Sequence, residues 1–473
     1  MMKQKLIDLY TQTFSTPPTA VEQIAAGGSS RVYYRLHSDE GPTVIGTIGK
    51  EEAENIAFMT LACKFRAAGH NAPRIYNHDE SHLCYLQEDL GDASLFSLLD
   101  SDNIRQYVAE TMRSLARLQT TEDIDFNVCY PEAEFSRRLI NWDLNYFKYC
   151  FLKPVVAEFN EHQLQDDFDR LADRIMSTPR QLWGFMYRDC QSRNVIIKDE
   201  QPYWIDFQGG RRGPLLYDVA SFLWQAKARF TDDFRQAMID VYLDELASVR
   251  DIDKCEAKAL TDDFVLFRTL QVLGAYGFRG LMQHKAHFMQ SIPFALDNLA
   301  SLISQGKLDL YPTLKSLCIY LCDNRRFKNS DTEGLNIKVF SFSYKKGYPE
   351  DISGNGGGFM FDCRAMHNPG RYAEYKSSTG LDKNVIDFLE SKGEVQEFLK
   401  SAWAMTEPAV ERYLKRGFTS LQIGFGCTGG QHRSVYCAQA TAMHLSRMFP
   451  EATVRLCHRE QGIDMTMKGG KMI

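Results

Sequence analysis

The sequence predicts a mixed α/β (α+β) protein in which a bilobal first domain is followed by a separate α/β domain. Alternation typical of strands is concentrated in residues 20–90, helical spacing dominates after residue 103, and a new strand pattern follows a polar, turn-rich stretch at 323–336. The chain has 473 residues, more than one ordinary hydrophobic core contains. We therefore predict a first domain at 1–325, a linker at 326–336 and a second domain at 337–473.

The composition is that of a soluble globular protein, with 44% hydrophobic and 25% charged residues. A net charge of -6 argues against general nucleic-acid binding. The first residues, MMKQKLIDLYTQTF, are amphipathic and unlike a secretory signal. No stretch approaches the ~18 apolar residues that a membrane helix needs. Together with 12 scattered cysteines, which indicate free thiols, these features predict a cytoplasmic protein without a membrane partner.

The small β-rich lobe contains predicted strands at 31–36, 43–49 and 82–90, with a helix at 51–68. Small residues precede the first of these strands. They form either a plain hairpin turn or a loop whose backbone N–H groups approach phosphates. The residues concerned are Gly27, Gly28, Ser29 and Ser30.

The stretch 187–223, YRDCQSRNVIIKDEQPYWIDFQGGRRGPLLYDVASFL, indicates phosphoryl transfer. This reaction requires a positioned hydroxyl group and a metal that offsets phosphate charge. Asp189, in a predicted loop, can accept the hydroxyl proton. Asn194 and Asp206 supply the oxygen ligands that Mg²⁺ prefers. Because a turn joins the two short strands around them, we expect Asn194 and Asp206 to lie together.

The spacing D-x₄-N, followed by I-D-F and Y-D-x-A-S, resembles the catalytic and metal loops of the aminoglycoside phosphotransferase family and, more distantly, the protein kinases. Within that family, NAPRIYNHDESHLCYLQEDLGDASL and RTLQVLGAYGFRGL are similar to the anomeric kinases of N-acetylmuramate and N-acetylglucosamine. The resemblance implies a protein-kinase-like fold, ATP and Mg²⁺ as cofactors, and a sugar or amino-sugar substrate. It also implies that Asp218 holds the catalytic loop.

The same resemblance implies where the nucleotide binds. A phosphate-binding lysine is expected on the strand at 43–49, where this sequence has Gly46 or Thr47, and Lys50 is a displaced candidate. Glu54 resembles the helical glutamate that pairs with that lysine; alternatively, it is a solvated helix charge. The hinge between the lobes, where backbone groups would meet the adenine, corresponds to Gln87, Glu88, Asp89 and Leu90.

The acceptor site is less defined by the sequence. Arg188 directly precedes the candidate base, and its charge either steadies the transferred phosphate or pairs with an acid. The segment 135–153 is rich in aromatic residues that suit a sugar ring or the packing of a helix. They are Trp142, Tyr146, Phe147 and Tyr149.

In the second domain, LQIGFGCTGGQHRSVYCAQATAMHL, residues 421–445, is a strand, a glycine-rich turn and an amphipathic helix. Backbone N–H groups at such a helix N-terminus favour an anion. Arg433 can bind two phosphate oxygens. The spacing C-x₅-R-S from Cys427 is also that of cysteine phosphatases, but the sequence identifies no acid partner for this thiol.

Five motifs in order, FSFSYKKGYPED, FDCRAMHNPG, TGLDKNV, GCTGGQHRSV and VRLCHRE, resemble the C-terminal domain of the RNase adaptor proteins of the RapZ family. The resemblance implies a domain that senses a hexosamine phosphate and contacts RNA or an RNase. In that family a P-loop domain precedes it, whereas here a kinase does. The implied phosphate-binding residues are Asp362, Arg364, His367, Asn368, Cys427, Thr428, Gly429, Gly430, His432, Arg433 and Ser434.

The favoured interpretation is an ATP-dependent sugar phosphotransferase with an appended hexosamine-phosphate-binding domain. The alternative is a regulatory metabolite- or RNA-binding adaptor that carries a weak or inactive kinase fold. The absent strand lysine favours the adaptor. The catalytic and metal residues favour the enzyme.

Overall fold

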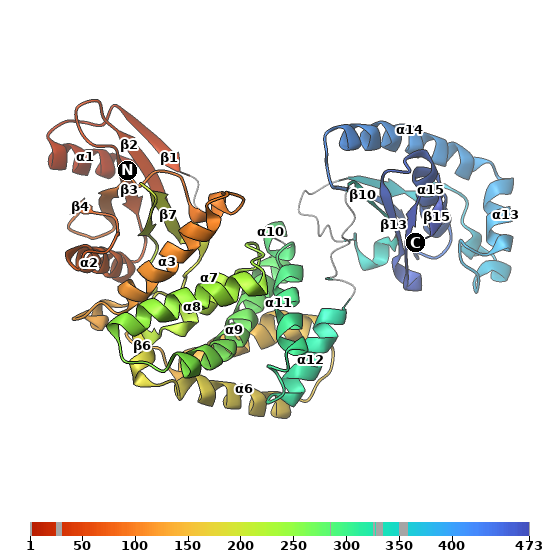
Figure 1. Ribbon diagram of the computed structural model, residues 1–473. Helices are drawn as coiled ribbons and strands as arrows, with labels where there is room; N and C mark the ends of the chain where they lie inside the picture. Colours follow the sequence, from red (N-terminus) through yellow and green to blue (C-terminus); the bar gives the residue numbers. More distant parts are fainter. Residues whose placement is uncertain are drawn as a thin grey trace. The chain divides into compact units, whose positions relative to one another are not determined.

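The computed structural model describes residues 2–24, 31–283, 285–324, 327, 334–349 and 358–472. The chain divides into two compact units (Figure 1). The first comprises Met1–Met282 and Ser291–Lys328, and the second is formed mainly by Asn329–Ile473. No helix in the described residues is long and apolar enough to cross a membrane.

The first unit begins with helix α1 (Met2–Phe14) and an antiparallel sheet in the order β1-β2-β3-β5-β4. Leu6, Leu9 and Tyr10 of α1 share a core with the sheet. A Cβ atom on Gly46 would lie 2.7 Å from Leu36 and 3.0 Å from Leu6, so this strand position faces α1. The strands are β1 (Ala20–Ile24), β2 (Val32–His37), β3 (Val44–Ile48), β4 (Ile75–His78) and β5 (Cys84–Glu88), and helix α2 (Glu52–Ala67) follows β3.

The larger lobe of this unit is mostly helical. Its helices are α3 (Ile104–Gln119), α4 (Arg137–Phe147), α5 (Lys153–Val155), α6 (Glu161–Met176), α7 (Leu216–Leu223), α8 (Asp232–Val249), α9 (Lys254–Tyr276), α11 (Ile292–Ser304) and α12 (Pro312–Asp323); α10 (Ala286–Met289) lies between α9 and α11 in the chain. Two π-helical turns, Lys148–Leu152 and Gly277–Met282, extend α4 and α9. They approach so closely that a Cβ atom on Gly277 would lie 2.2 Å from the Cys150 carbonyl oxygen.

Two short antiparallel strand pairs carry the loops of the helical lobe. Strand β6 (Trp183–Met186) pairs with β9 (Arg211–Pro214), and β7 (Val195–Lys198) pairs with β8 (Gln201–Trp204), both antiparallel. The loop between β6 and β7 contains the predicted catalytic residues. The loop between β8 and β9 contains Asp206, so both loops leave the same small framework of strands.

The second unit has a six-stranded sheet in the order β11-β12-β10-β13-β14-β15. Its first four strands are parallel, β14 pairs antiparallel with β13, and β15 pairs antiparallel with β14. Helix α15 contacts β10, β12 and β13 over a core that includes Ile337, Ile423 and Val454. The elements are β10 (Asn336–Ser343), β11 (Phe359–Asp362), α13 (Lys383–Ser391), α14 (Glu394–Lys415), β12 (Ser420–Cys427), α15 (Arg433–Met448), β13 (Thr453–His458), β14 (Ile463–Lys468) and β15 (Lys471–Met472).

The register of the parallel strands gathers their carboxyl ends at one edge. Asp362 lies opposite Gly426, and Ser343 lies opposite Cys427. In open parallel sheets, ligands bind in the crevice outside the carboxyl ends of the strands. The topology therefore makes the loop that follows β12 a candidate ligand-binding site.

Candidate active site and anion-binding loop

The catalytic loop is clamped by a buried carboxylate. The backbone N–H groups of Tyr187 and Arg188 donate to Asp218 at 2.6 and 2.9 Å, and Gln119 Nε2 donates to it at 2.7 Å. Arg188 has a φ of 78°, a strained conformation for a non-glycine residue of the kind that clusters at active sites. The clamp confirms the loop-holding role expected of Asp218. It leaves the side chain of Asp189 exposed.

Asn194 and Asp206 lie together, as the pattern of two short strands predicts. Strands β7 and β8 pair directly, and Ile205 N donates to the Asn194 carbonyl oxygen at 3.1 Å. Asn194 Nδ2 donates to the Asp189 carbonyl oxygen at 2.8 Å, which leaves the amide oxygen for a cation. Burial raises the pKa of Asp206, and the nearby Asp189 carboxylate adds to the rise. Two crowded carboxylates and an amide oxygen fit a hard divalent cation that retains several waters.

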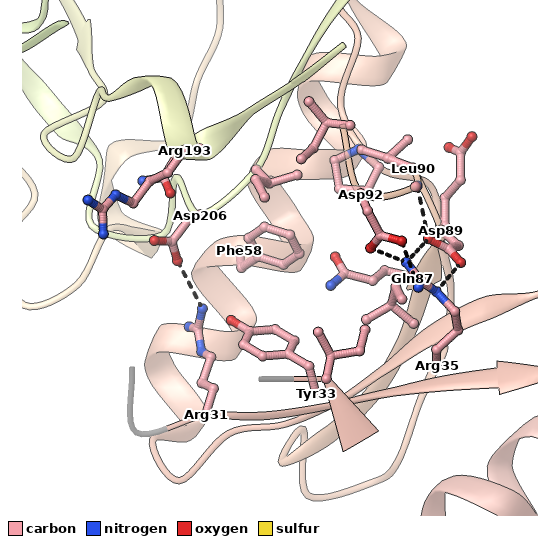
Figure 2. A pocket seen from close by; sticks show the side chains of 18 of the residues that line it. Arg31, Tyr33, Arg35, Phe58, Gln87, Asp89, Leu90, Asp92, Arg193 and Asp206 are labelled. Carbon is pink, nitrogen blue, oxygen red and sulfur yellow. Dashed lines mark hydrogen bonds and ion pairs between the residues drawn. The ribbon is translucent and has the colours of Figure 1, made fainter. Parts of the chain in front are cut away.

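A cavity of about 340 Å³ adjoins Asp206 (Figure 2). This volume lies within the range of small-molecule sites. The predicted hinge residues Gln87, Glu88, Asp89 and Leu90 all line it. Its apolar wall is formed by Ile24, Ile45, Phe58, Pro73, Ile196 and Ile205. The cavity therefore combines an apolar slot with a polar end at Asp206.

Ion pairs fix the hinge at the cavity wall. Asp89 accepts from Arg35 Nε at 2.7 Å, and Arg35 also reaches Asp92 at 2.8 Å, as Figure 2 shows. Glu88 pairs with Lys198 of β7 at 3.0 Å. These contacts join the sheet to the helical lobe on both sides of the hinge.

Glu54 pairs with Arg31, which was not predicted from the sequence to be a site residue. The Arg31 side chain is only 2% exposed; its Nη2 lies 3.4 Å from Glu54 Oε2, and its Nη1 lies 4.0 Å from Asp206 Oδ1 (Figure 2). Lys50, the displaced candidate, is exposed. Thr47 Oγ1 accepts from Gln87 Nε2 at 3.2 Å. The predicted phosphate loop, Gly27, Gly28, Ser29 and Ser30, lies outside the described residues.

Arg188 pairs with an acid. Its Nη2 forms an ion pair with Asp143 of α4, and the guanidinium lies 5.0 Å from the centroid of the Tyr217 ring. This ion pair offsets the charge, but the buried Nη1 of Arg188 has no hydrogen-bond partner among the described residues, so the pair does not exclude a contact with the transferred phosphate.

The aromatic residues near Arg188 divide between core and surface. Phe147 is fully buried, whereas Trp142 and Tyr149 are 56% and 51% exposed. Tyr146 packs against Phe278 with ring centroids 6.0 Å apart. Core packing therefore explains the position of Phe147 but not the positions of the exposed Trp142 and Tyr149 rings.

In the second unit, Cys427 ends β12 and lies inside the turn that leads to α15. Gly430 N donates to its Sγ at 3.2 Å, and Ser434 Oγ lies 3.1 Å from Sγ. Burial alone would raise the pKa of the thiol. Hydrogen bonds from the Ser434 hydroxyl and from the N–H groups of Ser434, Gln431 and Gly430 outweigh it and lower the pKa. The turn is therefore built to stabilise negative charge.

Arg433 anchors this turn to the segment after β11. Its Nη1 donates to the carbonyl oxygens of Arg364 at 3.0 Å and Met366 at 2.8 Å, and the residue is 4% exposed. Its Nε has no hydrogen-bond partner among the described residues. A buried guanidinium with an unsatisfied N–H is costly, and an anion would satisfy it. Thr428 and Gly429 are exposed beside it.

The remaining predicted phosphate residues have partners of their own. The Asp362 carboxylate binds the Arg364 guanidinium at 2.7 Å, and His367 Nδ1 lies 2.7 Å from Glu394. Asn368 accepts from Gly370 N at 3.2 Å. His432 Nε2 bonds to the Tyr375 carbonyl oxygen at 2.9 Å. These contacts tie the side chains to neighbouring segments of the second unit.

Two residues that border the turn, Ser343 and Glu460, were not predicted from the sequence. Ser343 Oγ donates to the Thr428 carbonyl oxygen at 2.8 Å. Glu460 accepts from Ser343 N at 3.3 Å, and a Cβ atom on Gly430 would lie 2.4 Å from its Cγ. Both residues lie close to the carboxyl ends of parallel strands. Only the order of the strands in the sheet identifies these two residues as neighbours of the turn, and no sequence motif gives that order.

Two protein families match this chain. Residues 20–252 match the phosphotransferase enzyme family, and residues 335–462 match the RapZ C-terminal domain. The first unit thus contains a phosphotransferase domain, and the expected bilobal kinase-like fold is confirmed. The chain as a whole joins this domain to a RapZ C-terminal domain, as its two sets of motifs predict.

Curated relatives match only part of the chain. A nucleotide-binding protein from Lactobacillus acidophilus is 40% identical over 134 residues, which are 28% of this chain and 43% of that protein. One from Lactobacillus gasseri is 37% identical over 148 residues, which are 31% of this chain and 47% of that protein. The chain spans less than half the length of these two relatives.

Solved kinase structures share little sequence with this chain. An amicoumacin kinase in complex with AMP-PNP, Ca²⁺ and Ami is 12% identical, with a TM-score of 0.46 over 70% of this chain and 96% of that one. A choline kinase from Cryptosporidium parvum is 14% identical, with a TM-score of 0.45 over 67% of this chain and 98% of that one. Neither likeness bears on the substrate of this chain.

Proposed function

We propose that the first unit is an ATP- and Mg²⁺-dependent phosphotransferase that acts on a hydroxyl group of a sugar or amino sugar. The observation that carries this proposal is the grouping of Asp189, Asn194 and Asp206 beside the cavity, with the loop clamped by Asp218. A structural loop would not need an exposed carboxylate on a strained, clamped backbone.

Each residue has a separate role in this proposal. Asp189, exposed at the tip of the loop, accepts the proton of the acceptor hydroxyl. The Asn194 amide oxygen and the Asp206 carboxylate hold Mg²⁺, which when bound offsets the charge of the phosphates. The apolar slot takes the adenine, and the backbone of residues 87–90 supplies its hydrogen bonds. Asp218 fixes the loop so that the base is preorganised.

The sugar class of the acceptor rests on two supports. The motifs that resemble anomeric amino-sugar kinases supply one. The other is the pair of exposed aromatic residues Trp142, on the helix that also contributes Asp143, and Tyr149, on the π-helical turn that follows it, because aromatic faces suit sugar rings. The resemblance of the second domain to a hexosamine-phosphate sensor connects both units to one class of metabolite.

ATP consumption by the full chain, measured against sugars, amino sugars and aminoglycosides, tests the enzyme proposal. We expect acceptor-dependent consumption with at least one N-acetylated amino sugar and none without Mg²⁺. Consumption only with aminoglycosides would contradict the proposed sugar class. No acceptor-dependent consumption would favour the alternative, a regulatory adaptor, for which Thr47 in place of the strand lysine is the supporting observation.

We further propose that the turn at 427–434 binds the phosphate of a hexosamine phosphate without hydrolysing it. A phosphatase needs an acid that holds a proton near neutral pH. The two carboxylates that border the turn are unsuited to this. The Arg364 guanidinium lowers the pKa of Asp362, and contacts with Lys346 and Arg459 outweigh burial and lower the pKa of Glu460. Incubation with glucosamine 6-phosphate should therefore release no inorganic phosphate, and release that depends on Cys427 would contradict the binding-only role.

A further inference from the structure

Three basic side chains line the described part of the cavity: Arg31, Arg35 and Arg193. Arg35 is held by Asp89 at 2.7 Å and Asp92 at 2.8 Å. Arg193 lies 5.8 Å from the centroid of the Phe96 ring. Arg31 is the third, and it lies at the polar end of the cavity beside Asp206.

The position of Arg31 is fixed from the side of helix α2. Its Nη2 lies 3.4 Å from Glu54 Oε2 and 3.4 Å from the Glu54 carbonyl oxygen, and the side chain is 2% exposed. Burying a guanidinium is costly unless acids offset its charge, and Glu54 supplies part of that offset. The other edge, Nη1, lies 4.0 Å from Asp206 Oδ1. Figure 2 shows the guanidinium directed at that carboxylate.

The strand expected to supply a lysine cannot place a cation here. Gly46 faces α1, and the Thr47 hydroxyl is engaged with Gln87. Lys50 is exposed beyond the end of β3. Within the described residues, then, Arg31 is the cation that both a helical glutamate and the candidate metal ligand adjoin.

We propose that Arg31 contacts the phosphate groups of the nucleotide and that Glu54 positions it. This inference rests on the proposed phosphotransferase function. Guanidinium groups bind phosphate oxygens in pairs, and the site next to Asp206 is where phosphates on a shared cation would lie. A residue at the start of β2 thereby replaces the missing lysine of β3.

The test compares Arg31→Ala and Arg31→Lys with Lys50→Ala in the full chain. Affinities for Mg·ATP and for adenosine are measured by calorimetry, and kcat and KM are measured with the best acceptor. We expect Arg31→Ala to weaken ATP binding about 10- to 100-fold, the scale of lost charge-assisted hydrogen bonds, without weakening adenosine binding. Arg31→Lys should recover part of the loss, and Lys50→Ala should match the wild type.

Wild-type ATP affinity in Arg31→Ala, or a loss that follows Lys50 instead, would overturn the assignment. Equal weakening of ATP and adenosine would show a merely structural role, and a thermal unfolding curve checks that each variant folds. If Arg31→Ala does not fold, the same comparison is made with Arg31→Lys: a loss of ATP affinity without a loss of adenosine affinity supports the phosphate contact, and unchanged ATP affinity contradicts it. A wild type that binds ATP but phosphorylates no acceptor contradicts the enzyme proposal alone, whereas one that binds no ATP contradicts both.

Discussion

The two proposed phosphate sites differ in the groups they offer. In the first unit, Asp189, Asn194 and Asp206 present oxygen atoms, so phosphate binding there would depend on a cation and on Arg31. In the second unit, the turn at 427–434 presents N–H groups and a buried guanidinium, which would bind an anion directly. The first arrangement includes an exposed carboxylate and suits transfer. In the second, the two described carboxylates that border the turn are held charged by basic partners, which suits recognition.

The most severe test of this contrast removes the base. Asp189→Asn should lower turnover by at least about 10², the range for a lost general base, while ATP still binds. Asp199→Asn is the matched control, because Asp199 is an exposed aspartate in the turn between β7 and β8, only ten residues away. Steady-state kinetics and ATP calorimetry give both quantities. Wild-type turnover in Asp189→Asn would remove its assigned role.

Asp206→Ala should act on the cation instead. Wild-type affinity for ATP should rise when Mg²⁺ is added, and the variant should lose this dependence because one of the two protein ligands is gone. Turnover falls with it. Calorimetry with and without Mg²⁺ measures the difference, and an unchanged response to Mg²⁺ would exclude Asp206 as a ligand.

In the second unit, Arg433→Ala should weaken binding of glucosamine 6-phosphate by about 1.5–3 kcal/mol, the scale of hydrogen bonds to a charged group. Cys427→Ser should change the affinity little, because a serine hydroxyl can accept the same hydrogen bond from Gly430 N and the Arg433 guanidinium is unchanged. Calorimetry on the full chain, with neutral glucosamine as the comparison ligand, measures both. Equal affinity of the wild type for the two ligands would argue against a phosphate site. Unfolding curves separate lost binding from the loss of the Arg433 contacts to Arg364 and Met366.

The smallest effect is expected from separating the units. We predict that limited proteolysis cuts first within residues 326–335 and leaves a fragment near 1–325 with unchanged turnover. Each unit has its own sheet and its own buried core, which is the physical reason. Cleavage elsewhere, or a single cooperative unfolding transition without cleavage there, would contradict the boundary.

The strands and helices with a strongly periodic apolar pattern were predicted well from the sequence. Strands β2, β3 and β5 and helices α2 and α3 follow the expected ranges closely, and β10 begins at Asn336 as expected. The strands β1 (AVEQI) and β4 (IYNH) were missed. Their residues are mostly half-buried or exposed, so they lack an alternating apolar pattern.

The candidate site was predictable where it depends on local order and not where it depends on packing. Asn194 and Asp206 are joined by one hairpin, and their proximity follows from the chain. The Arg31–Glu54 pair joins a strand to a helix 23 residues away, and the contact from Arg433 to Arg364 spans 69 residues. Such pairs follow from tertiary packing, which no short motif encodes.

The most direct test of the central claim is to identify the phosphorylated product. The full chain and its Asp189→Asn variant would be incubated with Mg·ATP and the acceptor that best stimulates ATP consumption, and the sugar would be analysed by mass spectrometry. We expect a sugar monophosphate that forms with the wild type and is reduced at least about 10²-fold with the variant. ATP consumed only to ADP and inorganic phosphate, or equal product from both proteins, would contradict it.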